Sequence, residues 1–538
     1  MVCTCWGAFC GQDLTICRRP PSDLRECVPH TVDENYLGPS VRHLESRGCF
    51  VDTAVSPRCA ATIHKSFTVT RTDHLLLAGR CCTDHYAGAV RWKDVDREIL
   101  RLAVPAFLAL IAEPLFLLSD AAIVGHLGTP ELAGLGIAAV VLQTAVGLCV
   151  FLAYGTTASV ARLLGAGDVR AALAQGIDGV WLAVIIGVAT TAAGVLLTEP
   201  LVGAFGAGAE VTDHGVTYLR IAFLGTTPLL VMLATTGILR GLQDTRTPLV
   251  VAVLGNALNI ALNFLLVYGL GPVPALGIAG SAIGSVIAQV ASAAALLLVV
   301  VRAARAEGSP MTPDLHGILG AAHAAVALVV RTVALRAALL VSTYAVTVAG
   351  PDTEVDLAAH QIAMTIWTFL AFALDAIAIA AQALTGRALG AGDAEATRAL
   401  TRRMVAWGIG SGVVTGLGLA ALSPYLGVLF TPDQDVRDLL VPVLLVAALG
   451  QPVAGVVFVL DGVLIGAGDG TYLAWTGLVV LGVYAPAALV AATAVHGLVA
   501  VWVAMAVVFM GARGVALWVR ARGDRWLLTG RGPEVVRR

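Results

Sequence analysis

Charged residues are scarce in this chain. Aspartate, glutamate, lysine and arginine make up 13% of its 538 residues, whereas hydrophobic residues make up 58%. A soluble domain carries about 25% charged residues, so the chain has too little charge to cover a surface of this size in water. The formal net charge of −2 also provides no basic surface for nucleic acid. We therefore expect the protein to lie in a lipid bilayer and not to bind nucleic acid.

Lysine is missing from most of the chain. Its two copies, Lys65 and Lys93, lie within the first hundred residues. A phosphate-binding P-loop needs the lysine of its Gly-Lys-Ser/Thr motif, so an ATP-driven pump of that type is excluded. No His-Glu-x-x-His motif occurs either, which removes the commonest pattern of a membrane metalloprotease. We expect no enzyme activity, no cofactor and no metal site, and any transport would have to be driven by an ion gradient.

Cysteine is nearly absent beyond residue 97. Nine of the ten cysteines precede that point, and Cys149 is the exception. Their spacing contains no Cys-x-x-Cys pair for a zinc module. The first twenty residues also lack the apolar core of a signal peptide, which a disulfide-stapled secreted domain needs. We interpret residues 1–97 as a polar extension that is disordered or translated from upstream of the true start, near Val90, and we expect no function from residues 1–90.

Apolar segments long enough to cross the hydrocarbon core of a bilayer recur after Glu98. There are twelve, at residues 102–125, 132–157, 176–197, 214–239, 247–271, 276–301, 326–349, 357–384, 403–423, 437–464, 472–494 and 496–519. The sequence therefore predicts an all-α polytopic membrane protein with twelve transmembrane helices.

The loops between these segments alternate in charge. One set carries arginines, such as Arg162 and Arg170 after the second segment and Arg302 and Arg305 after the sixth. The other set is mainly acidic, as in the loop at 352–356. Because loops rich in arginine stay in the cytoplasm, we expect both termini to be cytoplasmic, which requires an even number of spans.

A sequence pattern repeats at a constant distance. Ala161–Asp168 reads ARLLGAGD and Gly386–Asp393 reads GRALGAGD, so residue 393 follows residue 168 by 225 positions. The same offset relates Phe205 to Phe430 and Asp244 to Asp469. Six spans in each copy predict parallel repeats with a substrate site between them, near the membrane midplane. The predicted parts are an N-lobe at 98–305, a cytoplasmic linker at 306–325, a C-lobe at 326–525 and a basic cytoplasmic tail at 526–538.

The tetrapeptide Gly-Ala-Gly-Asp occurs three times, at 165–168, 390–393 and 466–469. A Gly-x-Gly-Asp signature also marks one class of intramembrane aspartyl protease, which needs a second aspartate facing the first inside the membrane. Here every copy follows the end of an apolar segment, where glycine terminates a helix. We interpret the three copies as structural turns.

Two acidic residues lie close together in the first apolar segment. A carboxylate at mid-membrane costs about 2.5–3.5 kcal/mol on insertion scales and is a functional candidate by default. Glu113 and Asp120 are seven residues apart, so nearly two helical turns place them on one face. Pro114 permits a bend between them. We predict that these two carboxylates couple transport to H⁺ or Na⁺.

Other polar residues inside the spans are candidates for a substrate cavity. Three asparagines, Asn256, Asn259 and Asn263, form one stripe that binds an ion or polar substrate, or holds helices together. Arg331 and Arg336 lie at the start of the seventh span. They could pair with the acids of later spans, or their side chains could reach the membrane interface, which is the favoured interpretation for Arg331. The candidate cavity residues are Asn259, Asn263, Asp375, Gln382, Asp461 and Arg331.

Several stretches of the chain resemble one family. In the first half they are Glu113-Pro114, Asp120–Gly128 and Arg162–Asp168, and in the second half Ala359–Ala363, Asp375–Asp393 and Leu460–Asp469. From Asp96 to Trp526 the chain resembles a multidrug and toxic compound extrusion (MATE) transporter of the bacterial DinF-type branch. The resemblance implies twelve helices in two six-helix lobes around a central cavity, with Asp120 as a proton or cation site in the N-lobe.

The resemblance also implies a function. Such transporters export organic, often cationic or amphipathic compounds in exchange for H⁺ or Na⁺. We expect the same here, in a bacterial cytoplasmic membrane and as a monomer. Many relatives carry an acid on the fifth helix where this chain has Asn263. This departure puts a two-aspartate coupling site in doubt and makes Glu113 with Asp120 the better candidate pair.

Two other functions remain as alternatives. A lipid-linked precursor flippase shares the two-lobe plan, but it should line its cavity with several basic residues. The charges inside the spans of this chain are mainly acidic, which favours cationic or neutral cargo. A membrane-embedded enzyme is the third hypothesis, against which the missing metal and protease motifs count.

Overall fold

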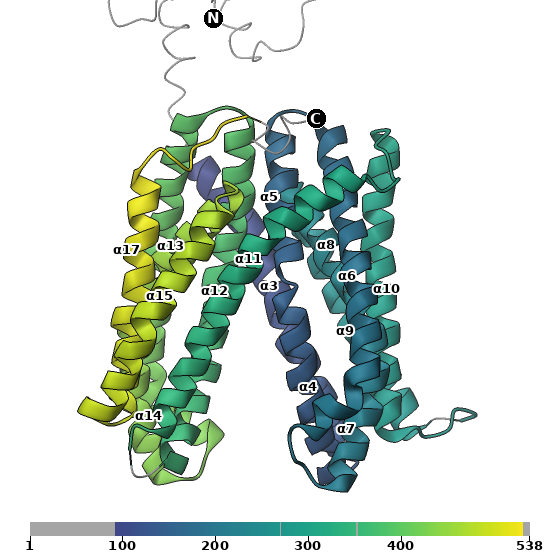
Figure 1. The fold of residues 1–538 in the computed structure, drawn as a ribbon, viewed down its shortest axis with the longest axis vertical. Helices are drawn as coiled ribbons and strands as arrows, with labels where there is room; N and C mark the ends of the chain where they lie inside the picture. Colours follow the sequence, from purple (N-terminus) through teal and green to yellow (C-terminus); the bar gives the residue numbers. More distant parts are fainter. Residues whose placement is uncertain (1–91, 270, 351–352, 531–538) are drawn as a thin grey trace, which may run out of the picture. The chain divides into compact units, whose positions relative to one another are not determined.

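Helices build the whole of the part that the structure describes. The structure is a computed structural model that describes residues 92–269, 271–350 and 353–530, all within one compact unit, Val90–Arg538. Within these residues, twelve helices are long and apolar enough to cross a membrane. Each overlaps one of the predicted spans, so the predicted fold class is confirmed (Figure 1). Residues 1–91 of the predicted extension and 531–538 of the predicted tail lie outside the described residues.

Four of the twelve spans contain more than one helical segment. In chain order the elements are α3 (Trp92–Gly125), α4 and α5 (Thr129–Leu148 and Phe151–Gly165), α6 (Val169–Gly203), α7, η2 and α8 (Ala209–Ala222, Phe223–Gly225 and Thr226–Gly241), α9 (Arg246–Tyr268), α10 (Gly277–Ala306), α11 (Leu315–Thr347), α12 (Thr353–Gly390), α13 (Ala394–Phe430), α14 (Gln434–Gly466), α15 and η3 (Gly470–Val490 and Ala491–Val495), and α16, η4 and α17 (Leu498–Ala504, Met505–Phe509 and Met510–Arg522).

Several helices extend well beyond the apolar segment that predicts them. The seventh is the clearest case, because α11 begins at Leu315 and not near residue 326. Asp314 caps it by accepting a hydrogen bond from the backbone N–H of His316. The connection between the halves is therefore residues 307–314, shorter than the predicted linker at 306–325. Arg331 therefore lies in the middle of α11 and not near its first turn.

Large apolar side chains are exposed on the outside of the helices. Leu196, Leu429 and Leu449 are each about 80% exposed. Contiguous exposed apolar surface is rare on soluble monomers, whereas lipid tails cover it without cost. This surface agrees with a multi-pass membrane protein.

The helices pack as two groups that correspond to the two halves of the sequence. In the first half, α9 packs on α10, α8 on α5 and α6, and α4 on α7. In the second half, α14 packs on α12 and α13, and α11 on α15. Contact between the halves runs mainly through α12, which lies against α3 and α5 (Figure 1).

Each copy of the repeated Arg-x-x-Gly pattern closes against the other copy. A Cβ on Gly165 would lie 1.9 Å from the carbonyl oxygen of Arg387, and a Cβ on Gly390 would lie 1.9 Å from that of Arg162. The glycines are therefore required for backbone contact between the ends of α5 and α12. Gly167 and Gly392, with φ of 77° and 84°, end these two helices in the left-handed conformation, which confirms the predicted turns.

The two arginines of this repeated pattern cross between the halves reciprocally. Arg162 donates from Nη1 to the carbonyl of Ala467, after the end of α14, at 2.9 Å. Arg387 donates from Nη1 to Oε1 of Gln243, after the end of α8, at 2.7 Å. Gln243 corresponds to Gly468 by the 225-residue offset. An arginine of each half therefore forms a hydrogen bond with the turn that ends a helix of the other half.

Replacing Gly165 with alanine is expected to weaken this closure. The added methyl group overlaps the Arg387 backbone, and overpacking of this kind costs about 1–3 kcal/mol. We expect amide hydrogen exchange in residues 386–393, measured by mass spectrometry, to rise by roughly tenfold. Gly410→Ala is the control, since a Cβ there meets nothing within 4 Å. Equal exchange in the two variants would contradict the closure.

Candidate functional site

Asp120 is buried inside the first half, where three other helices donate hydrogen bonds to its carboxylate. The hydroxyls of Tyr218 on α7 and Ser285 on α10 donate to Oδ2 at 3.3 and 3.2 Å. The side chain of Asn263 on α9 donates from Nδ2 to Oδ1. Asp120 is 2% exposed. No positive side chain of the described residues acts on it, so its charge is balanced only by hydrogen bonds.

The three asparagines of α9 make two different kinds of contact. Asn259 donates to Ser285 Oγ at 2.9 Å and accepts from Asn263 at 3.4 Å, so both belong to the Asp120 site. Within the described residues, the Oδ1 atom of Asn263 is buried without a hydrogen-bond partner. Asn256 instead donates to the Ala112 carbonyl of α3 at 2.6 Å and ties two helices together. The Asp120 site thus offers carboxylate and amide oxygens, the ligand type that hard cations prefer.

Glu113 has different surroundings from Asp120. It is exposed, seven residues before Asp120 on α3, and Arg336 of α11 acts on it electrostatically. No hydrogen bond of the described residues joins the two carboxylates. Their pairing as ion-coupling residues therefore stays a prediction, and the direct neighbour of Asp120 is Asn263.

A second group of polar side chains lies where the halves meet, and we call it the interlobe polar cluster. Its members line a small pocket and come from α5, α11, α12 and α14: Tyr154, Arg331, Asp375, Gln382 and Asp461. Gln382 crosses between the halves by donating to the Tyr154 carbonyl at 2.5 Å. The structure therefore brings all four cavity candidates of the second half, but neither asparagine of the first, into one pocket.

Arg331 does not reach the membrane interface. It lies inside α11 and donates from Nε to Oδ1 of Asp461 at 3.2 Å, with a second hydrogen bond from Nη2 to Oδ2. The interfacial interpretation is wrong because α11 begins sixteen residues before Arg331. The Arg331 and Asp461 side chains are 11% and 10% exposed, so this is a buried ion pair.

Sequence reasoning missed two arginines that act on the same cluster. Arg513 of α17 places Nη2 3.6 Å from Oδ2 of Asp461, and Arg240 at the end of α8 acts electrostatically on Asp375. Arg240 lies just after the fourth predicted span, and Arg513 lies inside the twelfth. An arginine within an apolar span is itself a signal of function. The cluster therefore contains three arginines for two aspartates.

Two six-helix halves, with polar residues buried inside the first half and between the two, form the site described above. The family model described as MatE matches residues 105–265 and 332–510, more than half of the chain. The chain belongs to the MATE family. MATE proteins are transporters and not enzymes, and multidrug resistance proteins of the NorM type are among the relatives of this chain.

Relatives of this MATE protein occur in plants and bacteria. The chain is 32% identical over 463 residues to Protein DETOXIFICATION 44, chloroplastic, of Arabidopsis thaliana, covering 82% of this chain and 85% of the relative. It is 31% identical over 301 residues to DNA damage-inducible protein F of Escherichia coli, covering 55% and 64%. The solved MATE transporter VcmN of Vibrio cholerae, in its bent form, has a TM-score of 0.73 at 20% identity, covering 81% of this chain and 98% of that one.

Proposed function

We propose that this MATE protein is a secondary active antiporter that exports small organic, amphipathic or cationic compounds in exchange for H⁺ or Na⁺. The observation that carries the proposal is the Asp120 site, a buried carboxylate with donors from three helices and no arginine or lysine of the described residues acting on it. Such a carboxylate can be neutralised by a proton. Alternatively, it can hold Na⁺ together with the Oδ1 atom of Asn263.

The membrane and the branch of the family are part of this proposal. We place the protein in a bacterial cytoplasmic membrane because DNA damage-inducible protein F is a bacterial relative. Both termini are placed in the cytoplasm because arginine-rich loops alternate with acidic ones. Identity to the Escherichia coli DNA damage-inducible protein F supports a DinF-type branch. The DETOXIFICATION relatives in Arabidopsis point equally to a plastid-type branch.

One observation favours a second candidate function. The argument against a lipid-linked precursor flippase was that charges inside the spans are mainly acidic. Arg240 and Arg513 add positive charge to the interlobe polar cluster. The charges between the halves are therefore not mainly acidic, and they no longer count against a flippase. Export of soluble organic compounds remains the better supported proposal because the whole-length relatives are MATE proteins.

Reconstituted protein tests the antiporter. Proteoliposomes containing the full chain are expected to move ethidium only when a proton or sodium gradient is imposed, and movement of ethidium is followed by its fluorescence. Imposing each gradient alone identifies the coupling ion, since collapsing the coupling gradient stops the movement. Ethidium movement that is identical in protein-free vesicles would reject the proposal. Movement of an intact headgroup-labelled lipid from one leaflet to the other would instead favour the flippase.

A further inference from the structure

The chain folds back over the contact between the halves after its last helix. Residues 523–530 follow α17, and we call them the C-terminal strap. Trp526 of the strap lies outside any helix, yet it is 2% exposed and belongs to the main hydrophobic core. Its indole N–H donates to the carbonyl of Ala521 at 3.2 Å, and the N–H of Leu527 donates to the carbonyl of Asp524 at 3.0 Å. The strap is therefore a packed part of the fold.

One residue of the strap is bonded to both halves. The N–H of Gly530 donates to the carbonyl of Leu389, at the end of α12, at 2.9 Å. The carbonyl of Gly530 accepts from Nε of Arg162, at the end of α5, also at 2.9 Å. Gly530 has a φ of 82°, in the left-handed region that glycine adopts readily. These two helix ends are the ones that close against each other through Gly165 and Gly390.

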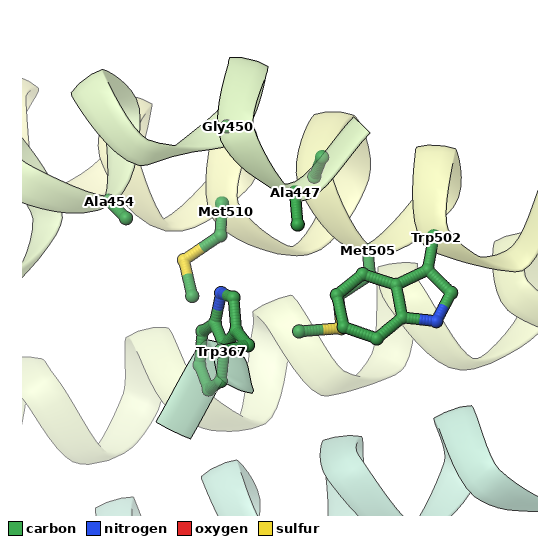
Figure 2. A pocket seen from close by; sticks show the side chains of 8 residues that line it. Trp367, Ala447, Gly450, Ala454, Trp502, Met505 and Met510 are labelled. Atoms are coloured by element: carbon green, nitrogen blue, oxygen red, sulfur yellow. The ribbon is translucent and has the colours of Figure 1, made fainter. Parts of the chain in front are cut away.

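The strap starts from a helix that is fixed to the second half. In Figure 2, Met505 and Met510 of the twelfth span lie beside Trp367 of α12 and the small residues of α14. The side chains there leave a cavity of only about 10 Å³, so the span is closely packed on its neighbours. Because α17 belongs to the second half, the hydrogen bond between Gly530 and Arg162 crosses between the halves.

Arg162 depends on the strap for one of its acceptors. It is 7% exposed, and its hydrogen bonds in the described residues go to two backbone carbonyls, from Nη1 to Ala467 and from Nε to Gly530. In the same part of the chain its Nη2 atom is buried without a partner. A buried charged group that loses a hydrogen bond is costly. Detaching the strap while the halves stay closed is therefore unfavourable, whereas separation of the halves lets water replace the lost acceptor.

The equivalent arginine of the second half is open to water. Arg387 lies 225 residues after Arg162, and its side chain is 49% exposed. Its acceptors are side-chain oxygens of Glu98 and Gln243, at 3.0 and 2.7 Å. Both arginines stabilise the same closure, but the strap contacts only the guanidinium of Arg162 among the hydrogen bonds of the described residues. The strap thus distinguishes two contacts that the repeat made alike.

We propose that the C-terminal strap stabilises the closed contact between α5 and α12 and has to detach before the halves separate at this end. The two hydrogen bonds of Gly530 need both helix ends in place, so a bound strap favours the closed state and closure favours a bound strap. A transporter that exposes its substrate site at alternate ends has to open here in each cycle. The strap therefore sets how often this end opens, and its effect on transport rests on the proposed exporter function.

Gly530→Ala in the purified full chain in lipid nanodiscs tests the strap. The added methyl group meets nothing within 4 Å, so the change acts through the left-handed backbone, whose cost for alanine shifts an equilibrium about tenfold. We expect amide hydrogen exchange, measured by mass spectrometry, to rise by roughly tenfold in three segments, 161–168, 386–393 and 523–530. Gly523→Ala is the matched control. Its φ of −82° suits any residue and its Cβ makes ordinary contacts, so exchange is expected to stay unchanged.

The distribution of the exchange decides the outcome. A rise confined to 523–530 would overturn the proposal, because the strap would then detach without affecting the closure. An equal rise in α9, inside the first half, would overturn it too, because the strap would then support the whole fold. Trp526→Ala is a second variant that removes the buried side chain of the strap. It is expected to raise exchange in the same three segments by more than Gly530→Ala does.

Ethidium transport in proteoliposomes separates the strap from the exporter function. Exchange is measured without a gradient, so it reports on the closure whether or not the protein transports ethidium. If Gly530→Ala leaves exchange in 161–168 and 386–393 unchanged while the wild type exports ethidium, the strap proposal fails and the exporter function stands. If exchange rises as expected but no gradient moves ethidium, the exporter function fails and the strap still stabilises the closure.

Discussion

Asp120→Asn is expected to reduce gradient-driven transport to the level of protein-free vesicles while leaving the protein folded. The amide keeps an oxygen that accepts hydrogen bonds from Tyr218 and Ser285. Its NH2 group replaces the oxygen that accepts from Asn263, and rotation of the Asn263 amide brings the unpartnered Oδ1 atom round to accept from it. The introduced amide cannot take up a proton or balance a sodium ion, so the coupling step is lost. Ethidium movement in proteoliposomes measures the loss, and thermal unfolding of the purified variant checks the fold.

Glu210→Gln is the matched control for this variant. It removes a carboxylate from the exposed first turn of α7 and is expected to transport like the wild type. Full gradient-driven transport by Asp120→Asn would remove Asp120 from the coupling mechanism. Glu113→Gln, made in parallel, then decides whether the exposed acid of α3 takes that part.

Asp461→Leu is expected to destabilise the protein by about 3–5 kcal/mol, because it leaves Arg331 and Arg513 buried without their shared partner. The free energy of unfolding in mixed micelles measures the effect. Replacing both arginines by methionine in the same chain is expected to recover most of the lost stability, because an apolar substitute for a buried ion cluster is often neutral.

An exposed ion pair is the control for that experiment. Arg398 and Asp524 lie 2.6 Å apart with side chains 45% and 79% exposed. Asp524→Leu is expected to change stability by less than about 1 kcal/mol. If Asp461→Leu costs no more than this control, Asp461 is not the counter-charge of the two arginines.

The spans were predictable because each needs about twenty apolar residues whatever its neighbours are. The helix ends were not, since α11 begins at Leu315 and its first turns contain His316 and His323, which interrupt the apolar run there. The interfacial interpretation of Arg331 followed from this, because a helix start at 326 places that side chain near an interface. The other interpretation, a partner for a later acid, agrees with the Arg331–Asp461 ion pair.

The candidate residues were predictable from the free-energy cost of placing a polar group in the membrane. The residues that they contact were not. A polar group inside an apolar span is expensive at any position, so Asp120, Asp375 and Asp461 stood out in the sequence. Spacing along one helix favoured Glu113 as the neighbour of Asp120, whereas packing of α3 on α9 placed Asn263 there. Contacts between helices depend on the tertiary arrangement, which a periodicity within one helix does not contain.

The reciprocal contacts of Arg162 and Arg387 have an evolutionary consequence. The same arginine and glycine act on both sides of the closure, as identical surfaces do at the isologous interface of a symmetric homodimer. A single six-helix unit carrying this pattern could therefore close against a second copy of itself before the copies became one chain. Fusion then allowed the interiors to diverge, so that Asp120 corresponds to Ala345 and Asp375 to Val150, while the closing surface remained common to both halves.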